Sequence, residues 1–386
     1  MAEEQTVTGA PLKRRQMLAL IGLVVAAFVF NTSEFMPVGL LSDIAASFAL
    51  TDAQAGFMIS VYAAGVAVLS LPLMAWASRF GFKELLLSVV LIFAAGQVLS
   101  ALAPTYAFLI CASKVAGPAH EAQAMSIVAT GSSIAQIVGM PLGRAVGLAV
   151  GWRMTFGLVG VVALIDLAFL FRVFPSLPKV ERFTLSRLPH LATCAPLIVL
   201  FCVTVLLAGG HYVAYGYIEP YLRDVAAFSA SGITGALILF GVAGFLASVL
   251  FGKFYDGHRR SYLAVSTAAV ALALLLLLPA SSSVIGEAAD LVVWSLGLTS
   301  FGIAFQALII EIADPRDASV AMAAYSGLYN LGIGAGTALG GAALDGLGAA
   351  SLGFVGGGLA LAGALAVDFL FLPLYMRFRD GVRKTA

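Results

Sequence analysis

Residues 21–41, IGLVVAAFVFNTSEFMPVGLL, form an almost unbroken apolar run with one carboxylate, Glu34, near its centre. About 20 apolar residues are enough to cross a bilayer as a helix. A charged side chain in the middle of such a helix costs about 2.5–3.5 kcal/mol on insertion scales. The run therefore predicts a membrane-spanning helix whose acid meets a partner, lines a water-filled cavity or carries out a task.

The whole chain has the composition of a membrane protein. Its 386 residues are 61% hydrophobic and only 11% charged, whereas soluble proteins carry about 25% charged residues. The mean hydropathy is +1.02. A soluble core cannot hide so much apolar surface, so we expect lipid to surround most of the chain. The net charge of +1 indicates no nucleic-acid partner, and the scattered cysteines and histidines predict no metal site and no cofactor.

The order of apolar and polar segments predicts two groups of spans. The longest polar break, 173–194, is the expected cytoplasmic loop between an N-terminal bundle at 17–172 and a C-terminal bundle at 195–376. Residues 1–16 and 377–386 are the expected cytoplasmic ends. The stretches long and apolar enough to span a bilayer are 17–41, 54–77, 84–103, 126–149, 153–172, 195–221, 231–252, 261–280, 289–309, 319–342 and 352–375.

The two groups resemble each other in sequence. Asp43 in LLSDIAAS matches Asp224 in YLRDVAAF, 181 positions later. Met125 matches Met322 at an offset of 197, and Gly139, Leu142 and Gly143 match Gly336, Leu339 and Gly340 at the same offset. Parallel repeats of six spans are a known transporter plan. We therefore expect an all-α membrane protein with two pseudo-symmetric six-helix bundles.

The offset between the matched positions grows from 181 at Asp43 to 197 at Met125, so the first half lacks residues between these two positions. This shortage predicts a shortened fourth span at 105–118. Basic loops follow the second, sixth and eighth spans and flank both ends, which places them in the cytoplasm by the positive-inside rule. The opposite loops carry mainly acids, such as Asp52, Glu287, Asp290 and Asp345. This alternation requires twelve crossings, so we expect 105–118 to cross as a shortened segment.

Enzyme signatures are missing from the sequence. Gly252-Lys253 is followed by Phe254, so no phosphate-binding P-loop is present, and there is no H-E-x-x-H. We therefore expect neither ATP-driven pumping by this chain nor an enzyme. The glycine run 332–341 lacks the strand–helix context of a dinucleotide site, and close helix packing is the favoured interpretation.

Two loops resemble the signature loop of the major facilitator superfamily. In MAWASRFGFKELL, Arg79, Gly81 and Lys83 match that signature, while Ser78 stands where the acid usually lies. The second copy, FGKFYDGHRRSYL, keeps Gly252 and Asp256. Such charges can form a cytoplasmic gate by re-pairing as two bundles rock. Ordinary positive-inside anchoring is the alternative.

The fifth predicted span carries glycines at every fourth position. Gly139, Gly143, Gly147 and Gly151 form one smooth face on which another helix can pack closely, and Pro141 bends the helix. Together with Gly151-Trp152-Arg153, this pattern resembles the antiporter motif of drug/proton exporters. Arg144 adds a charge that either pairs with an acid or faces the outer vestibule.

The seventh predicted span contains AGGHYVAYGYIEPYLRD. His211, Tyr212, Tyr215 and Glu219 would share one face of a continuous helix. Hydroxyls, imidazole and aromatic rings suit a polyhydroxylated ligand. In the first span Asn31 lies three residues before Glu34, on the same face. The alternative for Tyr212 and Tyr217 is an interfacial aromatic belt.

FNTSEFMPVGLLSDIA, SIVATG, GMPLGR, GWRMTF and HYVAYGYIEP together resemble the bacterial sugar efflux transporters, in the drug/proton antiporter branch of the major facilitator superfamily. The resemblance implies proton-coupled efflux of sugars such as arabinose, lactose or thiogalactosides across the inner membrane by a monomer. Glu34 would exchange the proton. The substrate contacts would be Asn31, His211, Tyr212, Tyr215 and Glu219. The alternatives are a multidrug or chloramphenicol-type exporter and a non-transporting relative inactivated by its short fourth span.

Overall fold

Long apolar helices joined by short turns make up the computed structural model, which describes residues 14–77, 79–115, 139–175 and 188–385. No strand occurs in these ranges. The helices of the first part are α1 (Arg14–Gly39), α2 (Leu41–Ser47), α3 (Asp52–Ala77), α4 (Phe82–Ala101), α5 (Tyr106–Val115), α7 (Met140–Val150) and α8 (Trp152–Val173). Those of the second part are α9 (Leu188–Leu191), α10 (Ala195–Tyr215), α11 (Ile218–Asp224), α12 (Ala230–Ala280), α13 (Val284–Ile312), α14 (Ala318–Leu347), α15 (Leu352–Ala366) and α16 (Leu372–Thr385).

Membrane-spanning helices dominate the described residues. Eight of their helices are long and apolar enough to cross a bilayer. One of them, α12, contains 51 residues and corresponds to two predicted spans. The predicted loop between those spans is helical, and the chain bends there at His258, whose φ of −137° and ψ of 36° are not helical.

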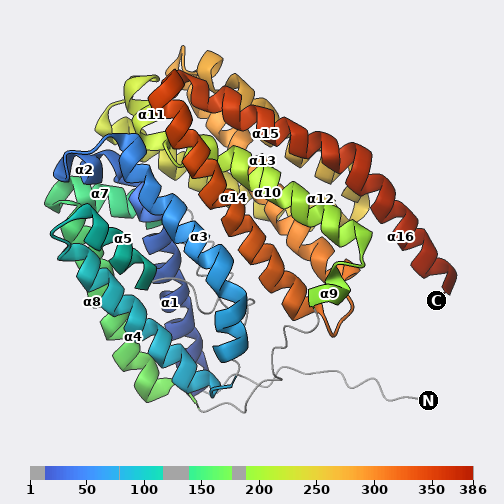
Figure 1. Ribbon diagram of the computed structural model, residues 1–386, viewed down its shortest axis with the longest axis horizontal. Coiled ribbons are helices and arrows are strands. Elements are labelled where there is room, and N and C mark those ends of the chain that lie inside the picture. Colours follow the sequence, from blue (N-terminus) through green and yellow to red (C-terminus); the bar gives the residue numbers. More distant parts are fainter. Residues whose placement is uncertain (1–13, 78, 116–138, 176–187, 386) are drawn as a thin grey trace.

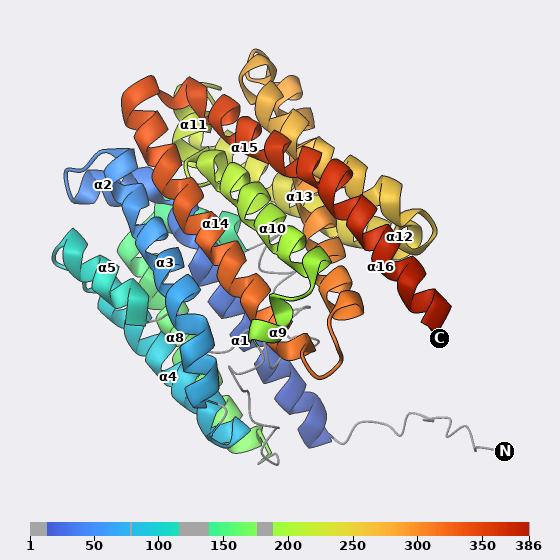
Figure 2. The same ribbon diagram turned by 45° about the vertical axis from the view of Figure 1, so that its right-hand side comes forward.

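The helices form two groups that follow the order of the chain. Figures 1 and 2 show α1 to α8 on one side of the molecule and α10 to α16 on the other. The two groups meet along α3 and α14, and again where α2 lies beside α11. At Gly334 of α14, a Cβ atom would lie 3.1 Å from the carbonyl oxygen of Ser60 in α3. The halves therefore pack closely along this seam.

Each group begins with a span that breaks just before a final helix of 7 residues, and the two breaks lie 177 positions apart, four fewer than the offset of 181 between Asp43 and Asp224. The predicted span 17–41 divides into α1 and α2 at Leu40, with φ −119° and ψ 17°. The span predicted at 195–221 divides into α10 and α11 at Tyr217, with φ −123° and ψ 23°. These nearly equal non-helical angles show the repeat in the backbone. They also remove Glu219 from the helix that carries His211, Tyr212 and Tyr215.

The matched glycines pack on the first helix of their own half. A Cβ at Gly139 would overlap the hydroxyl of Thr32 in α1, and one at Gly143 would lie 2.8 Å from Met36 Cγ. In the second half, a Cβ at Gly336 would overlap the carbonyl oxygen of Gly209 in α10, and one at Gly340 that of Val213. The glycine stripes therefore allow α7 to approach α1 and α14 to approach α10.

The described part of the fourth predicted span is α5, a helix of 10 residues. At 1.5 Å per residue it is about 15 Å long, which is about half of the hydrocarbon core of a bilayer. Residues 116–138 lie outside the described ranges, and so do Met125 and most of the span predicted at 126–149. Residues 1–13, Ser78 and 176–187, with their basic side chains, also lie outside them.

Candidate functional site

The acid that interrupts the first span lies where the two halves meet. Glu34 of α1 is half-buried. It lies close enough to the hydroxyls of Tyr212 in α10 and Tyr329 in α14 to interact with both electrostatically. One turn earlier, the Asn31 amide donates a hydrogen bond to the Ala27 carbonyl at 2.8 Å. The structure thus brings Glu34 and Tyr212 together from opposite halves, as the sequence analysis expected of one site.

The C-terminal half contributes a cluster of aromatic rings to this region. The imidazole of His211 stacks on Tyr215 with centroids 4.6 Å apart and meets the edge of Trp294 at 5.3 Å. Phe240 of α12 packs against Tyr215 at 5.2 Å and against Trp294 at 5.6 Å. His211 Nδ1 and Trp294 Nε1 are buried and have no hydrogen-bond partner among the described residues. They leave hydrogen-bonding capacity that a polar ligand could use.

Several residues of this region were not predicted from the sequence. Phe240 and Trp294 come from α12 and α13, and Tyr325 and Tyr329 stand one turn apart on α14, with ring centroids 6.0 Å apart. Tyr62 of α3 also interacts electrostatically with Tyr212. In the sequence, these residues are visible only as aromatic or polar side chains inside apolar spans. Many buried aromatic residues have the same setting, so this signal does not single out a site.

Glu219 lies at a different place, in an ion cluster between the halves. Arg144 Nη1 lies 3.4 Å from Glu219 Oε1, and the two side chains are only 3% and 4% exposed. The Ser42 hydroxyl donates to Glu219 Oε2 at 2.5 Å. Arg144 Nη1 also donates to the Gly39 carbonyl at 2.5 Å. Of the two alternatives for Arg144, the structure has the pairing with an acid.

A second ion pair joins the halves beside the first. Arg223 Nη2 lies 3.0 Å from Asp52 Oδ2, and the same guanidinium makes two hydrogen bonds of 2.8 Å to Asp224. These bonds hold the pKa of Asp224 below its ordinary value. Within the described ranges, both ion pairs that join α1–α8 to α10–α16 lie at this end, where α2 meets α11. At this end, ion pairs as well as packing hold the two halves together.

The predicted gating loops lie at the other end of the helices. Gly81 is the N-cap of α4 and Arg79 just before it is exposed, while the Lys83 ammonium lies 5.9 Å from the centre of the Phe171 ring. Asp256 pairs with Arg259 at 3.2 Å. No ion pair joins the two loops in the described part of the chain. Arg259 instead binds Glu311 at 2.6 Å.

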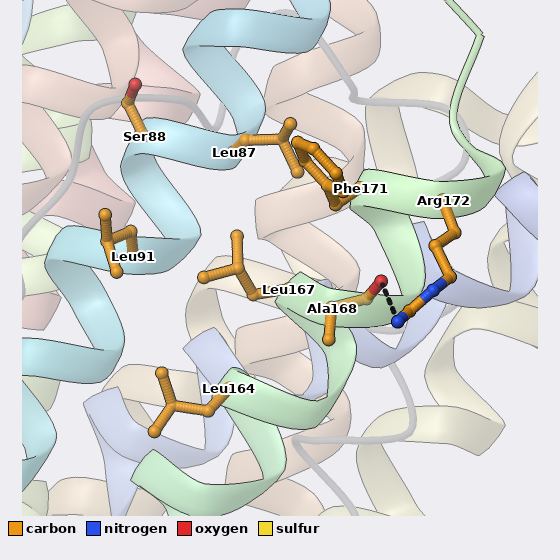
Figure 3. A pocket seen from close by; sticks show the side chains of 8 residues that line it. All are labelled: Leu87, Ser88, Leu91, Leu164, Leu167, Ala168, Phe171 and Arg172. Carbon is orange, nitrogen blue, oxygen red and sulfur yellow. Dashed lines mark hydrogen bonds between the residues drawn. The ribbon is translucent and has the colours of Figure 1, made fainter.

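A surface groove of about 560 Å³ lies between α4 and α8 (Figure 3). Exposed apolar side chains, among them Leu91 and Phe171, dominate its walls. It contains none of the predicted site residues, and its composition suits lipid chains. The residues that line it are Leu87, Ser88, Leu91, Leu164, Leu167, Ala168, Phe171 and Arg172.

With this geometry in place, comparison with known proteins decides the family. The family model of the Major Facilitator Superfamily matches residues 23–256 and, in a second alignment, residues 200–384. The chain belongs to this superfamily. It is therefore a multi-pass membrane protein of a transporter family, with the all-helical fold that the two sequence repeats predict.

Solved structures of the superfamily share this fold at low sequence identity. The human organic anion transporter MFSD10 (TETRAN) is 15% identical, with a TM-score of 0.69 over 93% of this chain and 100% of its own. The nucleoside transporter NupG is 13% identical, with a TM-score of 0.70 over 92% and 100% of the two chains. A bacterial homologue of the human lysosomal transporter Spinster, in an inward-facing conformation, is 16% identical, with a TM-score of 0.68 over 95% and 98%. At these identities the likeness concerns the fold alone.

Proposed function

We propose that this superfamily member is a bacterial inner-membrane exporter of sugars that works by alternating access and is driven by protons. Arabinose, lactose or thiogalactoside-like compounds are the expected substrates. The observation that carries the proposal is the position of Glu34. It is a carboxylate within a spanning helix, and it faces the hydroxyls of Tyr212 and Tyr329 from the other half.

The chemistry of the two sides of the site supports a sugar substrate. The N-terminal half supplies the carboxylate of Glu34 and the amide of Asn31, which suit hydroxyl groups. The C-terminal half supplies the flat faces of His211, Tyr212 and Tyr215, on which the C–H face of a sugar ring can stack. A polyhydroxylated ring has both kinds of surface. We therefore assign substrate contact to these residues.

Glu34 is the proposed proton carrier. A carboxylate in a half-buried, aromatic-lined site exchanges a proton when its surroundings alternate between water and protein. Substrate and proton would compete for the same space, because Tyr212 interacts with Glu34 and also packs against His211. Proton entry from one side would then release the sugar to that side.

Glu219 receives a different role from the one expected from the sequence. Its carboxylate pairs with Arg144 and accepts a hydrogen bond from Ser42. The break in the helix at Tyr217 separates it from Tyr215. We propose that the Arg144–Glu219 pair closes the α2–α11 end of the transport path. The orientation rule for basic loops places that end outside the cell, with both termini in the cytoplasm and Arg79, Lys83 and Asp256 at the inner gate.

The test uses the full chain in proteoliposomes with a pH-sensitive dye inside. Addition of arabinose or lactose should drive proton movement through the wild-type protein. Glu34→Gln should abolish the proton signal while sugar still quenches the tryptophan fluorescence, to which Trp294 beside His211 contributes. Asp345→Asn is the matched control, because Asp345 is an exposed acid at the α11 end. An undiminished proton signal in Glu34→Gln would reject the role of Glu34.

One observation favours a second candidate, a multidrug or chloramphenicol-type exporter. The aromatic cluster is richer in rings than in hydrogen-bonding groups, and such surfaces also take flat apolar compounds. Competition decides between them. If chloramphenicol elicits the proton signal and sugars neither elicit it nor compete, the drug exporter replaces the sugar exporter. If no compound elicits a signal until a full-length fourth span replaces 105–118, the chain is a non-transporting relative.

A further inference from the structure

Two acids that the sequence placed in a loop are buried inside the C-terminal half. Glu287 and Asp290 lie in the first two turns of α13 and stand three residues apart, on one face of the helix. Glu287 is 0% exposed and Asp290 is 8% exposed. Figures 1 and 2 show the turn between α12 and α13 at the same end of the molecule as α11.

In the described part of the chain, these carboxylates lack the hydrogen bonds and ion pairs that would offset the cost of burying a charge. Neither oxygen of Glu287 has a hydrogen-bond partner there, and Asp290 Oδ2 has none. No described lysine, arginine or histidine forms an ion pair with either acid. The start of α13 offers only the weak positive end of a helix dipole, and one of the amides in its first turn, that of Gly286, already donates to the Ser283 hydroxyl.

The groups that face the pair are few. Tyr221 of α11 is 1% exposed, and its hydroxyl interacts electrostatically with both acids. Trp294, one turn after Asp290, continues the same face of α13 and meets His211 of α10 at 5.3 Å. The acid pair thus lies between α11, which closes one end of the molecule, and the aromatic cluster of the candidate site.

Because the two acids are buried without a partner, the protonated form is favoured. An isolated ionised carboxylate in an apolar environment is so costly that the group takes up a proton instead. A second carboxylate one turn away adds like-charge repulsion, which further favours a proton on at least one of them. A protonated carboxyl can also donate a hydrogen bond, which an ionised one cannot.

We propose that Glu287 and Asp290 form a proton-binding site, separate from Glu34, that is occupied while Tyr221 of α11 lies beside the two acids and whose deprotonation loosens α11. The short helix α11 also carries Glu219 and Arg223, the C-terminal partners of both ion pairs between the halves. Loss of the proton would place a charge beside Tyr221 and favour entry of water. The site therefore links proton occupancy to the closure of this end, whichever substrate is transported.

Infrared spectroscopy of the full-length protein in lipid nanodiscs tests the occupancy. The wild-type protein at neutral pH should show a carbonyl stretch of a protonated carboxylic acid that shifts on exchange into D₂O. Glu287→Gln and Asp290→Asn should each remove or shift this band, and Asp345→Asn, at an exposed acid of the same end, should leave it unchanged. A spectrum of Glu287→Gln and of Asp290→Asn identical to wild type would overturn the proposal.

Hydrogen–deuterium exchange of the backbone amides of residues 218–224 tests the link to α11. After correction for intrinsic rates, protection of this segment should fall in the wild type as the pH rises above neutrality. In the Glu287→Gln/Asp290→Asn double variant, protection should no longer depend on pH, while Asp345→Asn should behave as wild type. The same pH dependence in the double variant would overturn the link. Neither measurement requires transport, so failure here is separate from failure of the proton coupling at Glu34.

Discussion

The two halves of the molecule have matching backbones but different chemistry at matching positions. The first span of each half breaks at Leu40 and at Tyr217 with nearly the same angles. By the sequence offset of 181, which is four more than the 177 positions between the two breaks, Glu34 of the N-terminal half corresponds to Tyr215 and Asn31 corresponds to Tyr212. Polar groups thus occupy one side of the candidate site where aromatic rings occupy the other.

The glycine stripes show the same division. Gly139 and Gly143 correspond to Gly336 and Gly340, and both stripes pack on the first helix of their half. Arg144, however, corresponds to Gly341. Arg144 reaches Glu219 in the other half, while the space at Gly341 holds the ring of Tyr217. The repeat preserves the helix contacts, and single positions within it supply the charges that join the halves.

The largest loss of stability should follow from replacing Arg144, which has no charged counterpart in the other half. Arg144→Met leaves the buried Glu219 with the Ser42 hydroxyl and a longer pairing with Arg223, at 3.6 Å. Loss of one partner of a buried ion pair typically costs about 3–5 kcal/mol. We therefore expect the melting temperature in lipid nanodiscs to fall further in this variant than in any glycine or Asp224 variant.

A double variant provides the control for Arg144. Arg144→Met/Glu219→Gln removes both charges and should recover much of the lost stability, because no uncompensated charge remains buried. A double variant whose loss equals the sum of the two single losses would show that the pair is not coupled.

Replacement of matched glycines should sharpen the comparison at the level of packing. Gly340→Ala forces a methyl group against the Val213 carbonyl, and a backbone atom cannot move aside. Overpacking of this kind costs about 1–3 kcal/mol. Gly143→Ala should cost less, because the atom in its way is Cγ of the flexible Met36 side chain. Melting temperatures of the two variants measure the difference.

The control for both glycines is Gly235→Ala. Gly235 lies within α12 and has open space around its missing Cβ, so alanine there should be neutral or stabilising by helix propensity, by up to about 1 kcal/mol. Equal losses at Gly340 and Gly143 would mean that the two stripes are packed alike, contrary to the structure.

Much of this fold could be predicted because hydropathy and repetition are properties of the sequence itself. The superfamily fold and the glycine packing faces follow from such patterns, whereas the functional role of the lone acid Glu34 stays a prediction. The break before Glu219 could not be predicted, because hydropathy continues across Gly216 and Tyr217 without interruption. The single helical face expected to hold both Tyr215 and Glu219 is therefore absent from the structure.

The remaining site residues depend on contacts between distant segments. Phe240, Trp294 and Tyr329 belong to spans whose apolar composition gives no sign of which face meets the centre. Glu287 and Asp290 were expected in a loop on the side opposite the basic loops. Their burial results from the packing of α12 against α13 and from Tyr221 of α11, which lies beside both acids. No local pattern encodes these contacts.

The smallest effect should come from Asp224, where the charge cluster reaches the surface. Its side chain is 53% exposed, so water screens its bonds to Arg223, and Asp224→Asn should cost less than about 1 kcal/mol at neutral pH. These bonds lower the pKa of Asp224, so the folded state holds the proton less tightly than the unfolded state. The contribution is complete above the ordinary aspartate value of about 3.9 and is lost as the pH falls through the lower folded value. The difference in melting temperature between wild type and Asp224→Asn should therefore be present at pH 7 and shrink in acid. A difference that grows on acidification would mean that Arg223 is held by Asp52 alone and that Asp224 repels the other acids of the cluster.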